Sequence, residues 1–259
     1  MMEMENKIGP WPCGFRKGFR IEDNLFVLTQ IKEMADKLGK NLIGGFIDIK
    51  KAYDMVDREK LFDIMVSEGV QDTWVELLGD IYEDNEIFIR IGKQESDRYK
   101  IDRGLRQGCP ASPVCFLMYY ERVARKLWES EKGFKIEYVE ETSGQMAGMR
   151  IPFLLFADDM LILARSNREL EEMMILCEGE TRKLGLKFNA KKSAIMVLNG
   201  NEERDIVIEF DGERVEYTDK YRYLGVTIMD SKHEILKEEK VIRKRKADIE
   251  AIIVKFMEF

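Results

Sequence analysis

The chain has 259 residues, 45% of them hydrophobic and 35% charged, and its formal net charge at pH 7 is −7. That length predicts one large domain or two small ones, with ample material for a hydrophobic core. The negative balance excludes a globally basic protein, so any nucleic acid would be held by local basic patches or through metal ions.

Apolar spacing indicates the elements of the first half of the chain. Residues 24–38 show the spacing of a helix, and residues 41–49 form an apolar run typical of a buried strand. Two further helices are expected at 58–68 and 71–84. A hairpin is expected to follow, with arms at 86–92 and 96–104.

The second half continues the same alternation of element types. Residues 112–129 are predicted as a helix with Pro113 near its first turn, where Pro is tolerated. A helix over 167–184 is expected to end at Gly185. Short strands and one long charged helix follow, at 193–198, 206–210, 213–217, 221–228 and 232–258. The interleaving predicts an α+β protein with a mostly antiparallel sheet.

Cysteine and histidine are both scarce. The single histidine, His233, lies in a charged segment and is interpreted as a solvated surface residue. This scarcity excludes Ser-His-Asp catalysis and His-rich zinc sites. No signal peptide or run of about 20 apolar residues occurs, which favours an intracellular, non-secreted protein. The cysteines form no C-x-x-C pair and are expected to be free thiols: Cys13, Cys109, Cys115 and Cys177.

Two adjacent carboxylates, Asp158 and Asp159, interrupt the apolar run "IPFLLFADDMLILA". Charges about 4 Å apart repel by roughly 4 kcal/mol at an effective dielectric near 20, and removal from water adds to that cost. The apolar arms, 151–156 and 160–164, predict a buried hairpin with the carboxylates at its tip.

Two interpretations of the acidic tip stay open on this segment alone. An ordinary β-turn would tolerate Asp but would favour Gly or Asn beside it, where the chain has Ala157 and Met160. Alternatively, a divalent cation at the tip would offset the repulsion.

A third carboxylate, Asp48, ends the apolar strand predicted over 41–49. It is compatible with an ordinary helix N-cap, as are Asp54 and Asp57. One carboxylate at a strand end and two at a hairpin tip can also converge on one edge of a sheet. Three carboxylates there would hold two Mg²⁺ ions about 3.5–4 Å apart, the arrangement that serves in-line phosphoryl transfer.

Five segments carry a resemblance to a known family. In order, "FIDIKKAYDMVDR", "GLRQGCPASPVCF", "FADDM", "LGLKFNAKKS" and "YRYLGV" resemble motifs A to E of reverse transcriptases, most closely those of non-LTR (LINE-like) retrotransposons. The resemblance covers about residues 14–228. It implies a right-hand polymerase palm, an antiparallel sheet with packed helices, with partial fingers and the start of a thumb. The implied divisions are 1–40 as residual fingers, 41–228 as palm with a fingers-like insertion around 58–104, and 229–259 as the start of a thumb helix.

The resemblance implies roles for residues of motifs A and C. Asp48, Asp158 and Asp159 match the metal ligands, and Ile49 would add its backbone carbonyl. The implied cofactors are two Mg²⁺ ions, with Mn²⁺ as a substitute. Tyr53 matches the aromatic gate whose ring leaves no room for a 2′-hydroxyl. The alternative for Tyr53 is a core aromatic on the first helical turn.

Motifs B and D imply further contacts. Gln107 and Gly108 match the loop that approaches the nascent base pair, where Gly permits close backbone approach. Arg106, like Arg103, would touch template phosphates or be a surface charge. Lys192 matches the lysine that donates a proton to pyrophosphate or approaches the phosphates, although Lys191 beside it leaves that choice open. Pro110, Ser112 and Pro113 would set the entry into the following helix.

Motif E is the hairpin that supports the primer end, and Tyr223, Leu224 and Gly225 match it. An ordinary sheet-edge hairpin is the alternative. The implied partners are an RNA template, a DNA primer and dNTP, without a membrane.

The resemblance departs from the complete family pattern at both ends. Upstream of motif A the only basic cluster is Arg16, Lys17 and Arg20, and it does not map onto the basic hairpin that grips a triphosphate. Downstream, "VIRKRKAD" at 241–248 would begin a thumb or be a solvated helix face. The sequence therefore predicts an RNA-directed DNA polymerase in truncated form, with a palm but only parts of the fingers and thumb. The alternatives are a catalytically inactive or domesticated palm that binds RNA or a protein partner, and a maturase-like relative.

Overall fold

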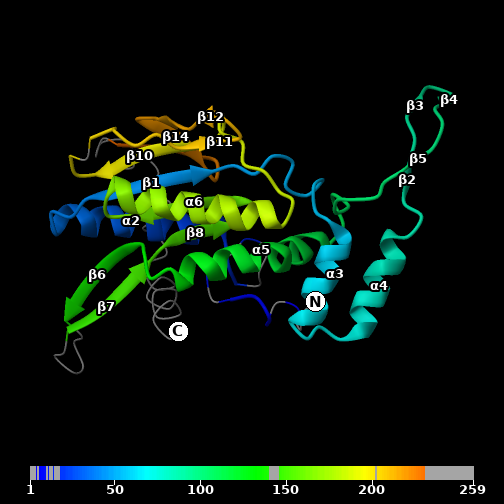
Figure 1. Cartoon of the computed structure of the whole chain (residues 1–259), viewed down its shortest axis with the longest axis horizontal. Helices are drawn as coiled ribbons and strands as arrows, with labels where there is room; N and C mark the ends of the chain where they lie inside the picture. The colour runs from blue at the N-terminus through cyan, green and yellow to red at the C-terminus, as the bar shows by residue number, and fades with distance from the viewer. Residues whose placement is uncertain are drawn as a thin grey trace.

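The computed structural model describes residues 18–139, 146–201 and 203–230, together with residues 4, 6–9, 11 and 14. A five-stranded sheet in the order β13-β10-β1-β9-β8 lies at the centre (Figure 1). All its pairings are antiparallel except the parallel pair β10 and β13, so the α+β prediction is confirmed. The strands are β1 (Leu42–Ile47), β8 (Phe153–Phe156), β9 (Asp159–Ala164), β10 (Ala194–Asn199) and β13 (Glu216–Tyr217).

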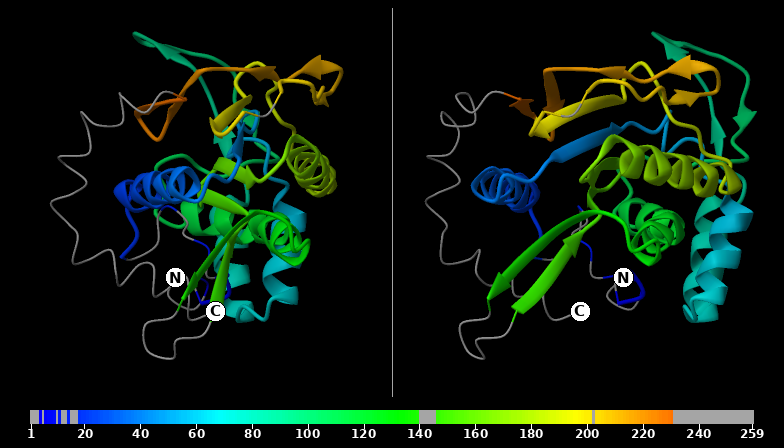
Figure 2. Two further views of the ribbon diagram at one scale, coloured as in Figure 1. Left: turned by 90° about the vertical axis from the view of Figure 1, so that its left-hand side faces the viewer. Right: turned by 60° about the vertical axis from the view of Figure 1, so that its left-hand side comes forward.

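Helices cover both faces of this sheet, which explains why the central strand β1 is apolar along its whole length and buried throughout. On one face, α5 (Ser112–Glu129) and α6 (Asn167–Lys183) pack in a core that includes Ile43 and Ile47. On the other, α2 (Ile21–Lys37) packs in a second core that includes Leu42 and Phe46. Figure 2 shows α2 and α6 on opposite sides of the sheet.

A glycine pair allows the close approach of these layers to β1. A Cβ built on Gly45 would lie 2.8 Å from the Met174 sulfur of α6, and one on Gly44 would lie 2.9 Å from a methyl of Leu198 on β10. Both distances are too short for real contacts. The "GG" in the strand therefore reflects packing rather than a turn.

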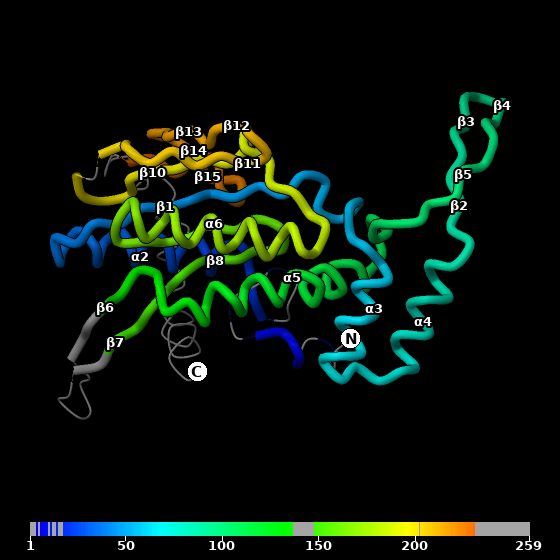
Figure 3. Tube along the Cα trace, viewed as in Figure 1, coloured from blue at the N-terminus to red at the C-terminus, as the bar shows by residue number. Residues whose placement is uncertain are grey.

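Between β1 and α5 the chain makes the excursion predicted from its pattern. Two helices are followed by a slender hairpin that projects from the body (Figures 1 and 3). The elements are α3 (Arg58–Ser67), α4 (Asp72–Tyr82), β2 (Glu86–Ile87), β3 (Arg90–Ile91), β4 (Gln94–Glu95) and β5 (Tyr99–Lys100). Asp57 is the N-cap of α3, accepting a hydrogen bond from the Lys60 amide at 3.3 Å.

The structure also contains a hairpin that no predicted element covers. Strands β6 (Phe134–Val139) and β7 (Met146–Ile151) pair antiparallel and project at the end opposite to β2–β5 (Figure 1). Ile151 pairs with Phe134 in this hairpin, so the predicted arm 151–156 was wrong at its start, and β8 begins at Phe153 after Pro152.

The C-terminal strands are shorter than predicted. The run 206–210 contains only β11 (Glu209–Phe210), and 213–217 divides into β12 (Glu213–Arg214) and β13. The run 221–228 is a hairpin of β14 (Lys220–Tyr223) and β15 (Val226–Met229).

Several predictions fall on other parts of the chain. The helix over 232–258 with its basic segment, His233, Cys13, Arg16 and Lys17 lie outside the described residues. Cys109, Cys115 and Cys177 are free thiols, as expected. In the part of the chain that is described, no helix is both long and apolar enough to cross a bilayer.

Candidate active site

The acidic tip is a tight turn between two buried strands. Phe156 pairs with Asp159, which leaves Ala157 and Asp158 as the two-residue connection. Ala157 has φ +57°, a left-handed conformation that costs a residue with a Cβ about 1–2 kcal/mol. The Asp pair is thus in a true hairpin turn, although the turn uses neither Gly nor Asn. The turn interpretation is confirmed in geometry, and the cation interpretation depends on what surrounds the tip.

Asp48 lies at the same edge of the sheet as the acidic tip. Strand β1 pairs with β9 so that Ile47 faces Met160, and the next position along this register sets Asp48 opposite Asp159. Residues 111 positions apart in the sequence therefore lie at the same edge, because two neighbouring antiparallel strands end and begin there.

The three carboxylates also act on one another electrostatically. Burial raises the pKa of Asp159 to about 6, and the charges of Asp158 and Asp48 add to the shift. Burial also raises the pKa of Asp158, again with a contribution from Asp48. Asp159 remains accessible to solvent, but it lines a pocket beside the apolar residues Phe156 and Ala157, which limits its hydration.

A turn at 189–193 holds the backbone of Asp48 on both sides. The Asn189 amide donates to the Asp48 carbonyl at 2.8 Å, and the Asp48 amide donates to the Ser193 hydroxyl at 3.1 Å. The Lys192 ammonium nitrogen lies 4.0 Å from an Asp48 carboxylate oxygen. Lys191 instead pairs with Glu213 at 3.2 Å. Of the two lysines that the sequence left open, Lys192 is the one at the carboxylates.

Tyr53 forms part of the wall between the carboxylates and α5. Its ring stacks on Phe116 with centroids 5.0 Å apart and planes 15° apart. Burial raises the pKa of Tyr53 to about 12, with the charge of Asp158 as the next cause. The ring is half-buried, so one face is packed like a core aromatic while the residue still lines the pocket.

Backbone pairing brings the motif B loop to Tyr53. The Leu105 amide donates to the Tyr53 carbonyl at 2.8 Å, and the Gln107 side-chain amide donates to Asp54 at 3.2 Å. Gly108 has φ +82°, which only Gly adopts without strain, and a Cβ there would meet nothing within 4 Å. The loop therefore presents open backbone next to the pocket.

The start of α5 anchors the other end of this loop. The Ser112 hydroxyl donates to the Arg106 carbonyl at 2.7 Å and contacts the Tyr82 hydroxyl at 3.2 Å. The Arg106 side chain, in contrast, is exposed and hydrogen-bonds Asn85. Arg106 lines neither of the pockets described below, and its contact with a template stays a prediction.

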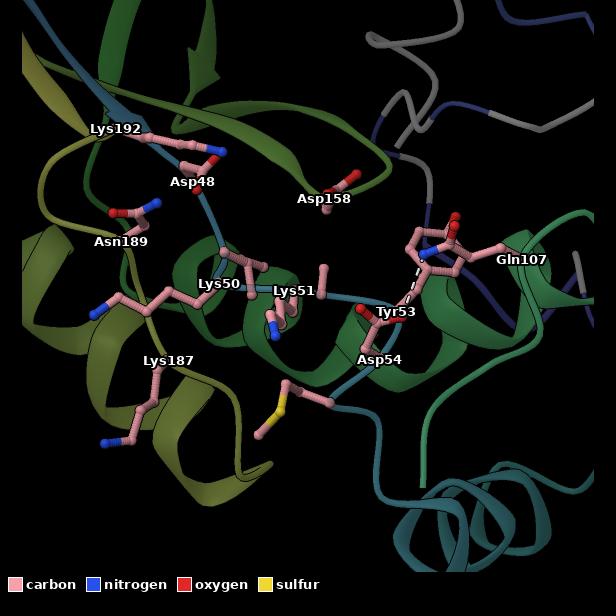
Figure 4. A pocket seen from close by; sticks show the side chains of 13 residues that line it. Asp48, Lys50, Lys51, Tyr53, Asp54, Gln107, Asp158, Lys187, Asn189 and Lys192 are labelled. Carbon is pink, nitrogen blue, oxygen red and sulfur yellow. Dashed lines mark hydrogen bonds and ion pairs between the residues drawn. The ribbon is translucent and has the colours of Figure 1, made fainter. Parts of the chain in front are cut away.

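Two pockets open beside the carboxylates. One, of about 720 Å³, contains most of the predicted residues of motifs A and D (Figure 4). The second, of about 600 Å³, lies between the hairpin tip and the start of α5. Both pockets share Tyr53, Gln107 and Asp158, so these side chains form the boundary between them. Ile49 lines the first pocket and Gly108 the second.

The first pocket also contains basic residues that the sequence analysis missed. Lys50, Lys51 and Lys187 line it together with Lys192 and Asn189 (Figure 4). Lys50 lies 4.0 Å from Glu213, and Lys187 lies 3.2 Å from Asp211. The "KK" after Asp48 was a visible signal for Lys50 and Lys51. No local sequence signal identifies Lys187, which the tertiary structure brings to the pocket.

The motif E residues occupy the hairpin β14–β15. Leu224, with φ +49°, and Gly225, with φ +85°, form its turn. Tyr223 is only 2% exposed and packs against Phe46, with centroids 5.6 Å apart. Its side chain therefore stabilises the hairpin from inside and presents no surface to a primer. The hairpin itself lies near Asp159, whose charge acts on Tyr223.

The donor chemistry suits a hard divalent cation, because the tip and β1 offer carboxylate oxygens whose mutual repulsion a cation would offset. As they stand, however, no three His, Cys, Asp or Glu side chains of the described residues form a group that could hold a metal ion. The carboxylates are near one another without forming a closed cage, so metal binding would require them to move closer together.

Comparisons with known proteins agree with this geometry. Residues 1–228 match the family described as "Reverse transcriptase (RNA-dependent DNA polymerase)". The chain is similar to Pol polyproteins of R2 retrotransposable elements, 25% identical over 215 residues in Nasonia vitripennis and 23% over 226 residues in Drosophila melanogaster. The matches cover 79% and 84% of the chain but 20% of each relative, so the chain spans about a fifth of the length of these curated relatives.

The fold is similar to that of solved telomerases. The structure of apo telomerase from Candida tropicalis aligns with a TM-score of 0.52 at 14% identity, over 79% of this chain and 34% of that one. A C-terminally truncated form aligns with a TM-score of 0.51 at 16% identity, over 72% and 36%. At this identity the likeness shows the fold alone, and that fold agrees with the predicted polymerase palm.

Proposed function

The chain belongs to the reverse transcriptase family, and we propose that it is the polymerase core of a non-LTR retrotransposon enzyme, extending a primer 3′-hydroxyl with dNTP on an RNA template. The observation that supports the proposal is the placement of Asp48 and the Asp158–Asp159 tip at one edge of the sheet, beside a pocket that Tyr53 and Lys192 also line. Within this proposal, 41–228 is the palm, the excursion around 58–104 is a fingers-like insertion, 1–40 is a residual fingers segment and 229–259 is the start of a thumb helix.

Reverse transcriptases use divalent metal ions. Here Asp48, Asp158 and Asp159, with the Ile49 carbonyl, would hold two Mg²⁺ ions, or Mn²⁺ in their place. When bound, such ions activate the primer hydroxyl and neutralise charge on the triphosphate and the leaving pyrophosphate.

The residues of the chain would orient the nucleotide around that centre. Tyr53, supported from behind by Phe116, would sit under the sugar and exclude a 2′-hydroxyl. Gln107 and Gly108 would face the nascent base pair at the edge of the same space. The pocket lysines would lie along the phosphate chain of the nucleotide and supply positive charge there, in addition to any that a fingers region supplies. They are Lys50, Lys51 and Lys187.

Lys192 would protonate the leaving pyrophosphate or neutralise it. It lies beside Asp48, and 70% of its side chain is exposed, so its ammonium is free to reach into the pocket. The hairpin carrying Leu224 and Gly225 would support the primer end through its backbone.

A primer-extension assay with an RNA template, dNTP and Mg²⁺ tests the proposal. Asp158→Asn should reduce incorporation by at least about 100-fold, because the variant loses a ligand of the ions that would stabilise the developing negative charge, and losing such stabilisation typically costs that much or more. Its unfolding temperature in metal-free buffer should stay near that of the wild type. Asp63→Asn, an exposed acid on α3, is the matched control and should keep full activity.

The same assay separates the alternative function. Absence of incorporation by the chain, and by a longer version that extends into the upstream fingers, would contradict the polymerase. Binding of RNA by such an inactive protein would then favour the non-catalytic palm.

A further inference from the structure

One aromatic residue of the β14–β15 hairpin links the carboxylate edge to the turn that carries Lys192. The Tyr221 ring stacks on Phe46 with centroids 4.2 Å apart and planes 18° apart. Phe46 lies on β1, two residues before Asp48, which follows the strand. The Tyr221 hydroxyl donates a hydrogen bond of 2.8 Å to the backbone carbonyl of Lys192. Tyr221 therefore touches the strand of the first carboxylate and the turn of the lysine at once.

The Lys192 side chain has little else to direct it. It is 70% exposed, and its one ion pair, with Asp48, is as long as 4.0 Å. A long exposed lysine samples many rotamers, and ordering it costs up to about 2 kcal/mol of entropy. Where its ammonium group points therefore depends on where the backbone of the 189–193 turn places its Cα.

Five hydrogen bonds hold that backbone. Two attach the turn to Asp48, through the Asn189 amide and the Ser193 hydroxyl. Within the turn, the amides of Lys192 and Ser193 both donate to the Asn189 carbonyl, at 3.1 and 2.8 Å. The Lys192 carbonyl faces the other way and is held from the hairpin by Tyr221. This last contact ties the turn to the β14–β15 hairpin, whereas the first two tie it to the residue that follows β1.

We propose that Tyr221 is a positioning residue that holds Lys192 over Asp48, the ring setting the hairpin on β1 and the hydroxyl setting the turn on the hairpin. The inference rests on the proposed function of Lys192 as the group that acts on pyrophosphate. It gives the β14–β15 hairpin a second task besides primer support.

The state of the hydroxyl agrees with this assignment. Burial raises the pKa of Tyr221 to about 12, and the charges of Asp48 and Asp159 contribute to the shift. The hydroxyl consequently stays protonated at neutral pH and keeps its hydrogen for the Lys192 carbonyl.

The first experiment reads the position of Lys192 directly and needs no catalysis. The full chain and its Tyr221→Phe variant are treated with an amine-acylating reagent at one pH, and the labelling rate of each lysine is followed by mass spectrometry. Tyr221→Phe keeps the ring stack and removes only the hydroxyl. Lys192 should be labelled about three- to tenfold faster in the variant, the range set by losing one hydrogen bond.

Two internal controls accompany this measurement. Lys191 is adjacent but paired with Glu213, so its rate should stay the same. Tyr217, on strand β13, carries a similar hydroxyl, which donates to Asn167 at 3.2 Å. Tyr217→Phe removes it and should leave the labelling rate of Lys192 unchanged. An unaltered Lys192 rate in Tyr221→Phe would overturn the proposal, and so would an equal change in Tyr217→Phe.

The second experiment asks whether Tyr221 acts through Lys192. In single-nucleotide incorporation, Tyr221→Phe should lower kcat by about three- to tenfold with little change in the KM for dNTP. In a Lys192→Ala background, the same substitution should have no further effect. Losses that multiply in the double variant would mean that Tyr221 supports the fold in general, and the proposal would be wrong.

The two experiments keep the proposals apart. If neither the wild-type chain nor the longer version incorporates a nucleotide, the polymerase function fails, and the labelling rates still decide whether Tyr221 positions Lys192.

Discussion

Asp158 and Asp159 are neighbours in the sequence but occupy different structural positions. Asp158 sits in the turn after the strained Ala157, on the boundary between two pockets, whereas Asp159 begins β9 opposite Asp48. Each carboxylate is therefore held by a different part of the hairpin. Burial, with a further contribution from the charges of Asp158 and Asp48, raises the pKa of Asp159 to about 6.

The raised pKa of Asp159 predicts that the stability of the folded protein depends on pH in metal-free buffer. The pKa of Asp159 is about 6 in the folded protein against an ordinary value of 3.8, so between these values the folded chain holds a proton that the unfolded chain has released. The free energy of unfolding should therefore fall as the pH rises through this window. Asp159→Asn should flatten the profile, as measured by urea unfolding at a series of pH values.

The pH profile of Asp159→Asn, and a wild-type profile of the opposite slope, test this prediction further. Because burial also raises the pKa of Asp158, some slope from that residue should remain in the variant. A wild-type protein that becomes more stable from pH 4 to pH 6 through this site would contradict the arrangement.

Tyr53 carries a prediction about sugar selection. Tyr53→Ala removes the ring that Phe116 supports, so use of ribonucleotides relative to dNTP should rise by about tenfold or more, the scale of a lost steric contact. Tyr53→Phe retains the ring and should retain discrimination, because the proposed gate is steric. Relative incorporation of ATP and dATP opposite the same template base measures both. Equal discrimination in all three proteins would count against the gate.

At the scale of elements, the site depends on how the excursion between β1 and α5 returns to the body. Arg58, at the start of α3, donates to three backbone carbonyls of the segment that follows β5: Ile101 at 2.8 Å, Arg103 at 3.1 Å and Gly104 at 2.8 Å. Its guanidinium also lies 4.6 Å from the centre of the Tyr82 ring. One side chain thus closes the base of the hairpin just before the Gln107 loop begins.

Replacing this clamp should cost stability and loosen the loop. Arg58→Met leaves the carbonyls without their donor, and we expect the free energy of unfolding to fall by about 1–3 kcal/mol. Arg90→Met, which breaks an exposed pair with Glu95 on the hairpin itself, should cost about 0.5 kcal/mol or less. Urea unfolding measures both, and hydrogen exchange should show faster exchange at 101–108 in Arg58→Met alone. Similar losses in the two variants would mean that the clamp has no special role.

At the scale of the whole molecule, the overall charge is negative while the first pocket gathers lysines around acids. The net charge of −7 would repel a triphosphate or an RNA at long range, so attraction must come from this local arrangement and from cations. Two hydrophobic cores on either side of one sheet hold the edge that carries the acids. The position of the acids is therefore set by the sheet, and the loops contribute the residues around them.

Added Mg²⁺ should therefore stabilise the protein through the acidic edge. At a free concentration about tenfold above Kd, binding adds about 1.4 kcal/mol, which corresponds to an increase in Tm of about 3–6 °C for a chain of this size. Asp158→Asn should lose most of the increase, and KCl at matched ionic strength should not reproduce it. Thermal unfolding followed by circular dichroism measures the shift. An equal increase in wild type and Asp158→Asn would place the binding elsewhere.

Much of the architecture was determined by the sequence alone. The helix predicted over 112–129 is found with those bounds, and the acidic hairpin, the strand before Asp48 and the order of elements agree with the structure. Apolar period and turn residues report which positions are buried and where the chain turns, and these are local properties. The family motifs added the identities of the acids. The hairpin β6–β7 was missed, although the alternation in "FKIEYV" is typical of a strand.

Only the tertiary structure decided which segments meet. It selected Lys192 over Lys191, brought Lys187 into the pocket, buried Tyr223 and set Tyr221 on the Lys192 carbonyl. None of these has a local signal, because the contacts join residues 29 or more positions apart and arise from strand register and the packing of two cores. A local pattern sets the free energy of one element by itself, whereas the pairing of distant elements depends on what the whole chain can bury at once.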